Sequence, residues 1–327
     1  MYVYYYYFSL PMLLISNFLV LLSDNFFFMW MIMEINLMCF ISMLAVYKFC
    51  YTQILMNYFL VQAFNSYLFL FSSILFSYNL MKNSMEFFIF FSMISKMGLP
   101  PFHFWYMSFM KQLNWMLFFI NSSMQKFIPL VIIYLNVSKS ILITCLMMMM
   151  IFLSPFLSVN FFTMKFIMCF SSFIQILWLV NLMMFNEIVW IVFFLIYNLI
   201  SFSLIYVFYK FNINYLHDLS LKNLNLINYL INFMIFSLAS IPPLSGFLNK
   251  LIYFKCMIYV NSMYFLVLLM LFSLMTLYFY IRIMMFNSMI FAVNVKKFNY
   301  LIKNFKMLNF SLAMMFTIFF FVLIELF

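Results

Sequence analysis

The chain has 327 residues, of which 69% are hydrophobic and only 7% are charged, and its formal net charge is +10. Soluble globular domains are about half apolar and about one quarter charged, so this composition excludes a water-facing globule. The lysines that carry the net charge are scattered through short loops, which is typical of polytopic membrane proteins and offers no clustered face for nucleic acid.

The spacing of polar and charged residues predicts where helices span the membrane. A helix needs roughly 20 apolar residues to cross the hydrocarbon core of a bilayer. We expect an all-α fold in which eleven helices form one membrane domain over residues 1–327. The first has no basic segment before it and reads as a spanning helix, not as a signal peptide. The expected helices cover residues 2–23, 25–46, 53–78, 85–111, 114–135, 139–158, 160–185, 187–209, 224–260, 262–286 and 308–326.

The basic residues predict the orientation of these helices. With an odd number of spans, nine basic side chains fall in or near the loops on the N-terminal side and three on the other. The positive-inside rule then places the N-terminus on the matrix or cytoplasmic side and the C-terminus outside. The first group is Lys48, Lys111, Lys210, Lys222, Arg282, Lys296, Lys297, Lys303 and Lys306, and the second is Lys82, Lys139 and Lys255.

Two further features of the composition concern the origin of the chain and its cysteines. Residues with AT-rich codons are abundant, including 52 phenylalanines and 35 methionines, which indicates an organelle-encoded protein. The five cysteines show no paired spacing, so we interpret them as packed apolar residues without a disulfide or metal role.

Two of the expected helices are interrupted, at Lys96–Phe102 (KMGLPPF) and at Ser240–Lys250 (SIPPLSGFLNK). Proline donates no backbone hydrogen bond and clashes with the preceding turn, so each segment must open its helix and free backbone carbonyls. The interruptions fall in the fourth and ninth helices, each the fourth of a five-helix run. Matching interruptions in inverted halves are typical of transporters, which predicts repeats over about 1–135 and 139–286 followed by the helix at 308–326. Two independent proline kinks are the alternative.

Four charged residues are predicted to lie inside the membrane and not at its surface. Glu34 and Lys126 sit in the middle of apolar helices, Lys96 precedes the first interruption and Lys250 follows the second. Each charge costs about 2.5–3.5 kcal/mol on insertion scales. Burial and like charges favour the neutral amine of a lysine, whereas a nearby carboxylate favours the ammonium, so moving such groups together or apart would switch protonation. Buried ion pairs that only orient helices are the alternative.

Other polar residues allow two interpretations each. His103, directly after the first interruption, could join a water chain or cap the second half-helix. Ser171, Ser172 and Gln175 lie on nearby faces of one helix, where helix–helix hydrogen bonding and a place on a water path are both open. No glycine-rich phosphate loop, metal-ligand spacing or nucleophile–base pair is present in the sequence.

Four segments together resemble one known family. WMIMEINLMCFISML, SKMGLPPFHFW, MQKFIPL and SIPPLSGFLNK occur in the order and spacing of subunit 2 of the NADH dehydrogenase of mitochondrial respiratory complex I, in its truncated animal form. The resemblance implies an antiporter-like, proton-pumping subunit of the inner mitochondrial membrane. It also implies that Glu34 pairs with Lys96, that Lys126 is the central relay, and that Lys250 is the terminal lysine, with water wires between them.

The resemblance carries expectations about cofactors and partners as well. The chain itself would hold no cofactor, because FMN, iron–sulfur clusters and ubiquinone belong to other subunits. Its partners would be other membrane-arm subunits, including neighbouring antiporter-like ones, and membrane lipids such as cardiolipin, with no nucleic acid. One departure is Gln175, which stands where the family usually has histidine. Glutamine cannot titrate, so protons would have to pass there by water, hydroxyls and amides.

Three functions therefore stand after the sequence alone. The first is a proton-translocating subunit of NADH:ubiquinone oxidoreductase. The second is a stand-alone cation/proton antiporter of the same superfamily, although free antiporters usually carry more carboxylates and more helices. The third is a purely structural membrane subunit.

Overall fold

A computed structural model describes residues 2–46, 52–78, 82–136, 140–158, 161–184, 189–216, 218, 225–242, 244–260 and 263–294. The helix expected over 308–326 lies outside these residues. So do seven of the basic residues used to predict the orientation, namely Lys48, Lys139, Lys222, Lys296, Lys297, Lys303 and Lys306.

The described residues are almost entirely helical, which confirms the expected fold class. They divide into two compact units, with the boundary between Leu153 and Ser154. The first unit holds α1 (Tyr2–Leu21), α2 (Phe26–Val46), α3 (Thr52–Ser77), α4 (Lys82–Met97), α5 (His103–Gln112) and α6 (Trp115–Asn136). The boundary falls inside α7 (Ile141–Ser158), and the second unit continues with α8 (Met164–Met184), α9 (Trp190–Phe211), α11 (Asn225–Leu238), α12 (Ser245–Val260) and α13 (Met263–Asn294).

Seven helices of the described part are long and apolar enough to cross a membrane. They form because long apolar runs are free of glycine and seldom hold proline, so nothing stops the helical hydrogen-bond ladder. Most helices end within a few residues of their expected positions. The exception is α13, which continues to Asn294 where residue 286 was expected. Residues 287–294 hold no proline, glycine or charge, so the helix extends past the bilayer thickness that set the prediction.

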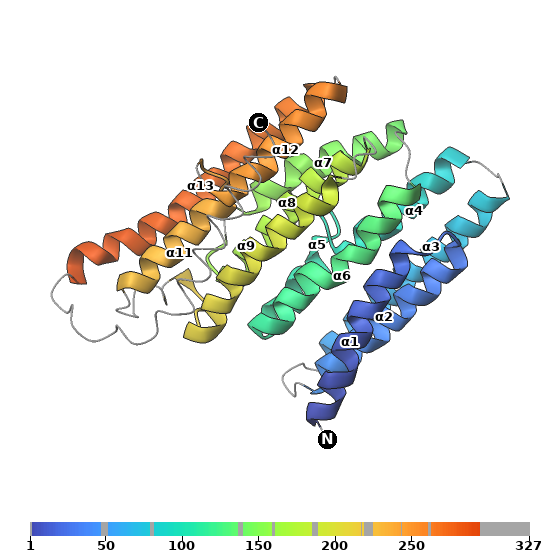
Figure 1. Cartoon of the computed structure of the whole chain (residues 1–327), viewed down its shortest axis with the longest axis horizontal. Coiled ribbons are helices and arrows are strands. Elements are labelled where there is room, and N and C mark those ends of the chain that lie inside the picture. Colours follow the sequence, from blue (N-terminus) through green and yellow to red (C-terminus); the bar gives the residue numbers. More distant parts are fainter. Residues whose placement is uncertain are drawn as a thin grey trace. The chain divides into compact units, whose positions relative to one another are not determined.

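Within the first unit, α2 packs against both α1 and α3, and α4 packs against α3 and α6 (Figure 1). The helix with the most buried side chains among the spans wholly inside this unit is α6. Within the second unit, α9 contacts α8, α11 and α12, and α8 is the most deeply enclosed spanning helix. Each unit therefore has one central helix, and these two helices carry Lys126 and the Ser171–Gln175 segment respectively.

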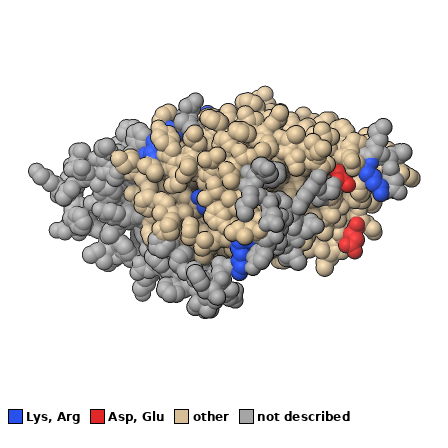
Figure 2. Space-filling model, turned by 90° about the horizontal axis from the view of Figure 1, so that it is seen from above, with Lys and Arg blue, Asp and Glu red and all other residues tan. Residues whose placement is uncertain are grey.

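Large apolar side chains are exposed on the peripheral helices, as a lipid-facing surface requires. Leu22 is 81% exposed, and Phe64 and Leu274 are more than half exposed. Figure 2 shows a face on which the described surface is almost entirely uncharged. Among the basic residues expected in or near loops, Lys82, Lys111, Lys210 and Lys255 are exposed, which agrees with long side chains that reach the membrane interface.

Both proline-containing segments interrupt their helices, as expected. In the first, α4 ends at Met97 and α5 begins at His103; in the second, α11 ends at Leu238 and α12 begins at Ser245. The two helix ends have the same backbone geometry. Gly98 (φ +68°) and Ser240 (φ +58°) both adopt the left-handed conformation, and each stands two residues before a Pro-Pro pair.

The hydrogen bonds at these two ends also correspond. The amides of Gly98 and Leu99 donate to the carbonyls of Ser95 and Ile94, at 3.2 and 3.3 Å. Those of Ser240 and Ile241 donate in the same pattern to Ser237 and Phe236, at 3.0 and 3.3 Å. This is the Schellman arrangement, which ends a helix and satisfies its last carbonyls. The two interrupted helices therefore end in the same way, and the internal repeat stays a prediction.

Candidate functional site

The four membrane charges predicted from the sequence all lie on helices. Lys96 is 14 residues after Lys82 on α4, which corresponds to ~21 Å along the helix axis. Lys126 has eleven residues of α6 before it and ten after it. Its side chain is only 2% exposed, so this ammonium is fully enclosed by protein. Glu34 and Lys96 are partly buried, and Lys250 is the sixth residue of α12.

Glu34 and Lys96 come together through α2, α3 and α4. The ammonium nitrogen of Lys96 lies 3.4 Å from the sulfur of Met33, the residue before Glu34 on α2. The carboxylate of Glu34 accepts a hydrogen bond from the hydroxyl of Ser66 on α3. The negative charge of Glu34 attracts the ammonium group of Lys96 electrostatically. The structure thus places the predicted pair in one cluster, with α3 as the third participant.

Ser66 can accommodate both protonation states of Glu34. Its hydroxyl has one proton and two acceptors within reach, the Glu34 carboxylate and the carbonyl of Ala63 at 2.8 Å. An ionised carboxylate can only accept, whereas a protonated one can donate. Ser66 can therefore donate to ionised Glu34, or accept from protonated Glu34 while it donates to Ala63.

Gln62 satisfies the carbonyl that the first interruption exposes. In a continuous helix the carbonyl of Lys96 would accept from the amide of residue 100, but Pro100 has no N–H. The side-chain nitrogen of Gln62 donates to this carbonyl instead, at 3.0 Å. Because Gln62 and Ser66 are four residues apart, they lie on the same face of α3. One face of α3 thus contacts both the carboxylate of Glu34 and the backbone carbonyl of Lys96.

Two more polar contacts surround this cluster. The hydroxyl of Ser95 donates to the side-chain oxygen of Asn65 on α3, at 2.8 Å. The side-chain nitrogen of Gln125, next to Lys126, donates to the side-chain oxygen of Asn36 on α2, at 3.0 Å. None of these amides and hydroxyls was predicted from the sequence. The signal that could have found them is the spacing of Gln62, Asn65 and Ser66 on a single face of an otherwise apolar helix.

Lys126 faces an aromatic ring in the enclosed centre of the first unit. Its ammonium nitrogen lies 4.8 Å from the centroid of Tyr106 on α5. The preceding turn of α6 adds the buried polar residues Asn121, Ser122 and Ser123. This helix face is therefore polar in its middle, which is where proton-carrying groups of a membrane protein are found.

His103 is the first residue of α5 and is buried. Its Nδ1 lies 3.2 Å from the carbonyl of Pro101, and its ring lies 4.2 Å from that of Phe104. The imidazole thus contacts a backbone carbonyl of the interrupted segment. Phe102 is the N-cap of α5 and makes no side-chain capping hydrogen bond, so the capping role and the place on a water chain both stay predictions.

The second unit contains a buried hydroxyl cluster around Ser171 and Ser172. Ser171 and Ser172 donate to the carbonyls of Met168 and Cys169, at 2.8 and 2.7 Å. Tyr197 lies near both serines, and Tyr280 lies near Ser171. Gln175, one turn further along α8, is partly buried.

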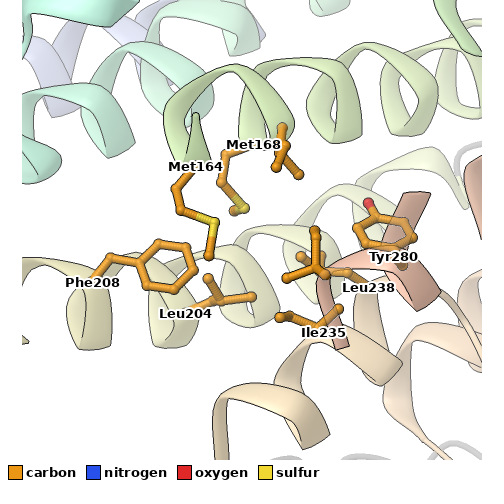
Figure 3. A pocket seen from close by; sticks show the side chains of 9 residues that line it. Met164, Met168, Leu204, Phe208, Ile235, Leu238 and Tyr280 are labelled. Atoms are coloured by element: carbon orange, nitrogen blue, oxygen red, sulfur yellow. The ribbon is translucent and has the colours of Figure 1, made fainter. Parts of the chain in front are cut away.

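A small cavity lies beside this cluster, between α8, α9, α11 and α13 (Figure 3). Its volume is about 10 Å³, roughly the space that one water molecule requires. The lining is apolar except for Tyr280, and a buried water needs two to four polar partners. The cavity is therefore a packing space and offers no site for a ligand. Its lining residues are Met164, Ile167, Met168, Leu204, Phe208, Ile235, Leu238, Tyr280 and Ile283.

Gly246 explains the close packing at the second interruption. A Cβ added to this glycine would overlap the carbonyl oxygen of Ser237, so α12 begins directly against the backbone of α11. Lys250 follows one turn later on the same helix. The second interruption thus holds Lys250 on a short, tightly packed half-helix.

A helical membrane bundle with buried charges beside interrupted helices is the architecture of ion-translocating membrane proteins. No protein-family model matches the chain. It is 31% identical over 307 residues to NADH-ubiquinone oxidoreductase chain 2 of Anopheles gambiae, covering 90% of this chain and 88% of that protein. It is 32% identical over 302 residues to the protein of the same name from Rhipicephalus sanguineus, covering 88% and 93%.

The fold is also found in a solved structure. A chain of respiratory complex I from Thermus thermophilus with bound aureothin matches with a TM-score of 0.78 and 16% identity, over 86% of this chain and 70% of that one. The chain belongs to the NADH-ubiquinone oxidoreductase chain 2 family of respiratory complex I.

Proposed function

We propose that this chain carries protons across the membrane as an antiporter-like core subunit of the membrane arm of NADH:ubiquinone oxidoreductase. The observation that carries the proposal is Lys126, an ammonium group 2% exposed in the middle of an apolar helix. Such a charge costs several kcal/mol in a membrane. A subunit that only held its neighbours together would be more stable with an apolar residue at this position.

The proposed route uses the four charged residues in sequence. Glu34 and Lys96 form the pair that changes its separation, Lys126 is the central relay, and Lys250 is the terminal lysine. His103, Ser171, Ser172 and Gln175 lie along the water path. Support comes from the shared cluster of Glu34 and Lys96, and from the hydroxyl groups of Ser171 and Ser172, one turn before Gln175 on α8.

The proposal includes the surroundings of the subunit. We place it in the mitochondrial inner membrane. Its N-terminus would lie in the matrix and its C-terminus in the intermembrane space, because the basic residues are distributed unequally between the two sides. Its partners are the neighbouring antiporter-like subunits and lipids such as cardiolipin. Electron transfer by FMN and iron–sulfur clusters and the reduction of ubiquinone take place in other subunits, and this chain contributes no redox group.

The experiment that tests this function is Lys126→Met in the assembled complex. Methionine fills a similar volume without a titratable group. The variant complex is expected to assemble, to lose proton translocation and to lose most coupled NADH oxidation. A variant that assembles and pumps with the normal proton-to-electron ratio would show that the chain has a structural role only.

The stand-alone antiporter is tested by the size of the native protein. Solubilised in mild detergent, the chain is expected to migrate with a large assembly that oxidises NADH. Migration as a small particle without this activity would favour the antiporter.

A further inference from the structure

The ring of Tyr106 lies beside the central lysine of the first unit. The ammonium nitrogen of Lys126 is 4.8 Å from the ring centroid, within the ~6 Å over which a cation is attracted to an aromatic face. Both side chains are only 2% exposed. Because both side chains are buried, the attraction is stronger than at a protein surface.

The first interruption brings this ring to its position. Gly98 turns the chain with φ +68°, and a Cβ at this residue would lie 2.5 Å from the Cβ of Tyr106. Tyr106 therefore packs directly on the backbone of the turn, which no residue other than glycine allows. Trp105, whose ring meets that of Tyr106 edge-on with centroids 5.7 Å apart, supports the ring from the side.

We propose that Tyr106 is a positioning residue that holds the protonated side chain of Lys126 against its ring, and that the turn at Gly98 fixes the ring for this purpose. The inference rests on the proposed relay role of Lys126 and adds a second residue to it. Gly98, Tyr106 and Lys126 then form one chain of contacts from the interrupted helix to the central lysine.

The contact depends on the charge of Lys126. A ring face attracts an ammonium ion through its quadrupole, but a neutral amine gains little from it. The protonated side chain is thus held at the ring, and the side chain that has given up its proton is released. The ring links the position of the side chain to its protonation, which is what a relay between two neighbours requires.

The test compares three substitutions in the assembled complex. Tyr106→Phe keeps the ring and is expected to keep proton translocation within about twofold. Tyr106→Leu removes the ring and is expected to reduce proton translocation at equal complex content by roughly 5- to 30-fold, the factor that corresponds to about 1–2 kcal/mol of cation–π attraction. Tyr58→Leu is the matched control, because Tyr58 is equally buried and stacks on Phe109 with centroids 4.5 Å apart.

The control variant is expected to lose stability without a selective loss of pumping. If Tyr106→Leu lowers the amount of assembled complex, Tyr106→Met, with its flexible gap-filling side chain, is scored in its place. Equal rates of proton translocation at equal complex content in the ring-free variant and the parent would overturn the inference, as would a loss in Tyr106→Phe as large as in Tyr106→Leu.

A comparison of the two single variants separates this inference from the proposed function. Normal pumping in Lys126→Met alone would contradict the proposed function itself, whereas a loss in Lys126→Met with no loss in Tyr106→Leu would reject only the role of Tyr106.

Discussion

Ser66 donates a hydrogen bond to the carboxylate of Glu34. Charge-assisted hydrogen bonds of this kind contribute about 1.5–3 kcal/mol, so Ser66→Ala is expected to slow coupled NADH oxidation roughly tenfold or more. Ser66→Thr keeps the hydroxyl and is expected to retain most of the activity. The measurement is the rate of NADH oxidation in membranes that contain equal amounts of assembled complex.

A matched control for this prediction lies on the same helix. Ser72 is as buried as Ser66 but donates to the carbonyl of Phe69 and does not contact Glu34 in the described structure. Ser72→Ala is expected to leave the rate nearly unchanged. If both alanine variants slow the enzyme equally, the hydrogen bond to Glu34 has no specific role.

Gln62 is predicted to stabilise the first interruption. Gln62→Leu would leave the carbonyl of Lys96 without its side-chain donor, and an unsatisfied buried polar group costs about 1–3 kcal/mol. We expect a lower thermal stability of the complex, measured by loss of activity on heating. Asn57→Leu, an exposed amide on the same helix, is expected to have little effect; an equal shift in both variants would rule out this specific role.

Substitutions at two positions of the second interruption are expected to change the stability of the protein in opposite directions. Gly246→Ala is expected to prevent or strongly reduce assembly, because its Cβ would overlap the carbonyl of Ser237. Ser240→Gly is expected to be neutral or stabilising by up to about 1 kcal/mol, since glycine adopts the left-handed conformation without strain. Normal assembly of Gly246→Ala would show that α12 does not pack on α11 in this way.

The hydroxyl cluster of the second unit can be tested by non-additivity. Ser171→Ala and Tyr280→Phe each remove one partner of the same contact, so the double variant is expected to slow proton translocation no more than the stronger single variant. The rates are measured at equal complex content. Fully additive losses would mean that the two hydroxyls act independently.

Much of the fold could be predicted from the sequence because membrane helices are determined by local composition. Long apolar runs gave the helix positions, and the Pro-Pro pairs at Pro100 and Pro242 gave the two interruptions. Glu34 and Lys126 were recognised for the same reason, since a charge within an apolar run needs no structural information to be noticed. These features depend on the bilayer, which acts on each segment separately.

The partners of these charges could not be predicted in this way. Which face of α3 meets α2 and α4 depends on tertiary packing, so the contacts of Gln62 and Ser66 appear only in the folded chain. The ring of Tyr106 is one of many aromatic residues, and nothing in the local sequence distinguishes it. Its position follows from the turn at Gly98, eight residues earlier.

Access of water to Lys126 is the most direct test of the proton route. In the assembled complex, Lys126→Cys would be treated with a small charged thiol reagent, and its labelling compared with that of the parent chain, of Lys210→Cys at an exposed position, and of Ile132→Cys at an apolar buried position of α6. Labelling of Lys126→Cys, with none at Ile132→Cys, is the expected result. A cysteine at position 126 that stays unmodified while Lys210→Cys reacts would contradict an aqueous path to a titratable group in the bilayer interior.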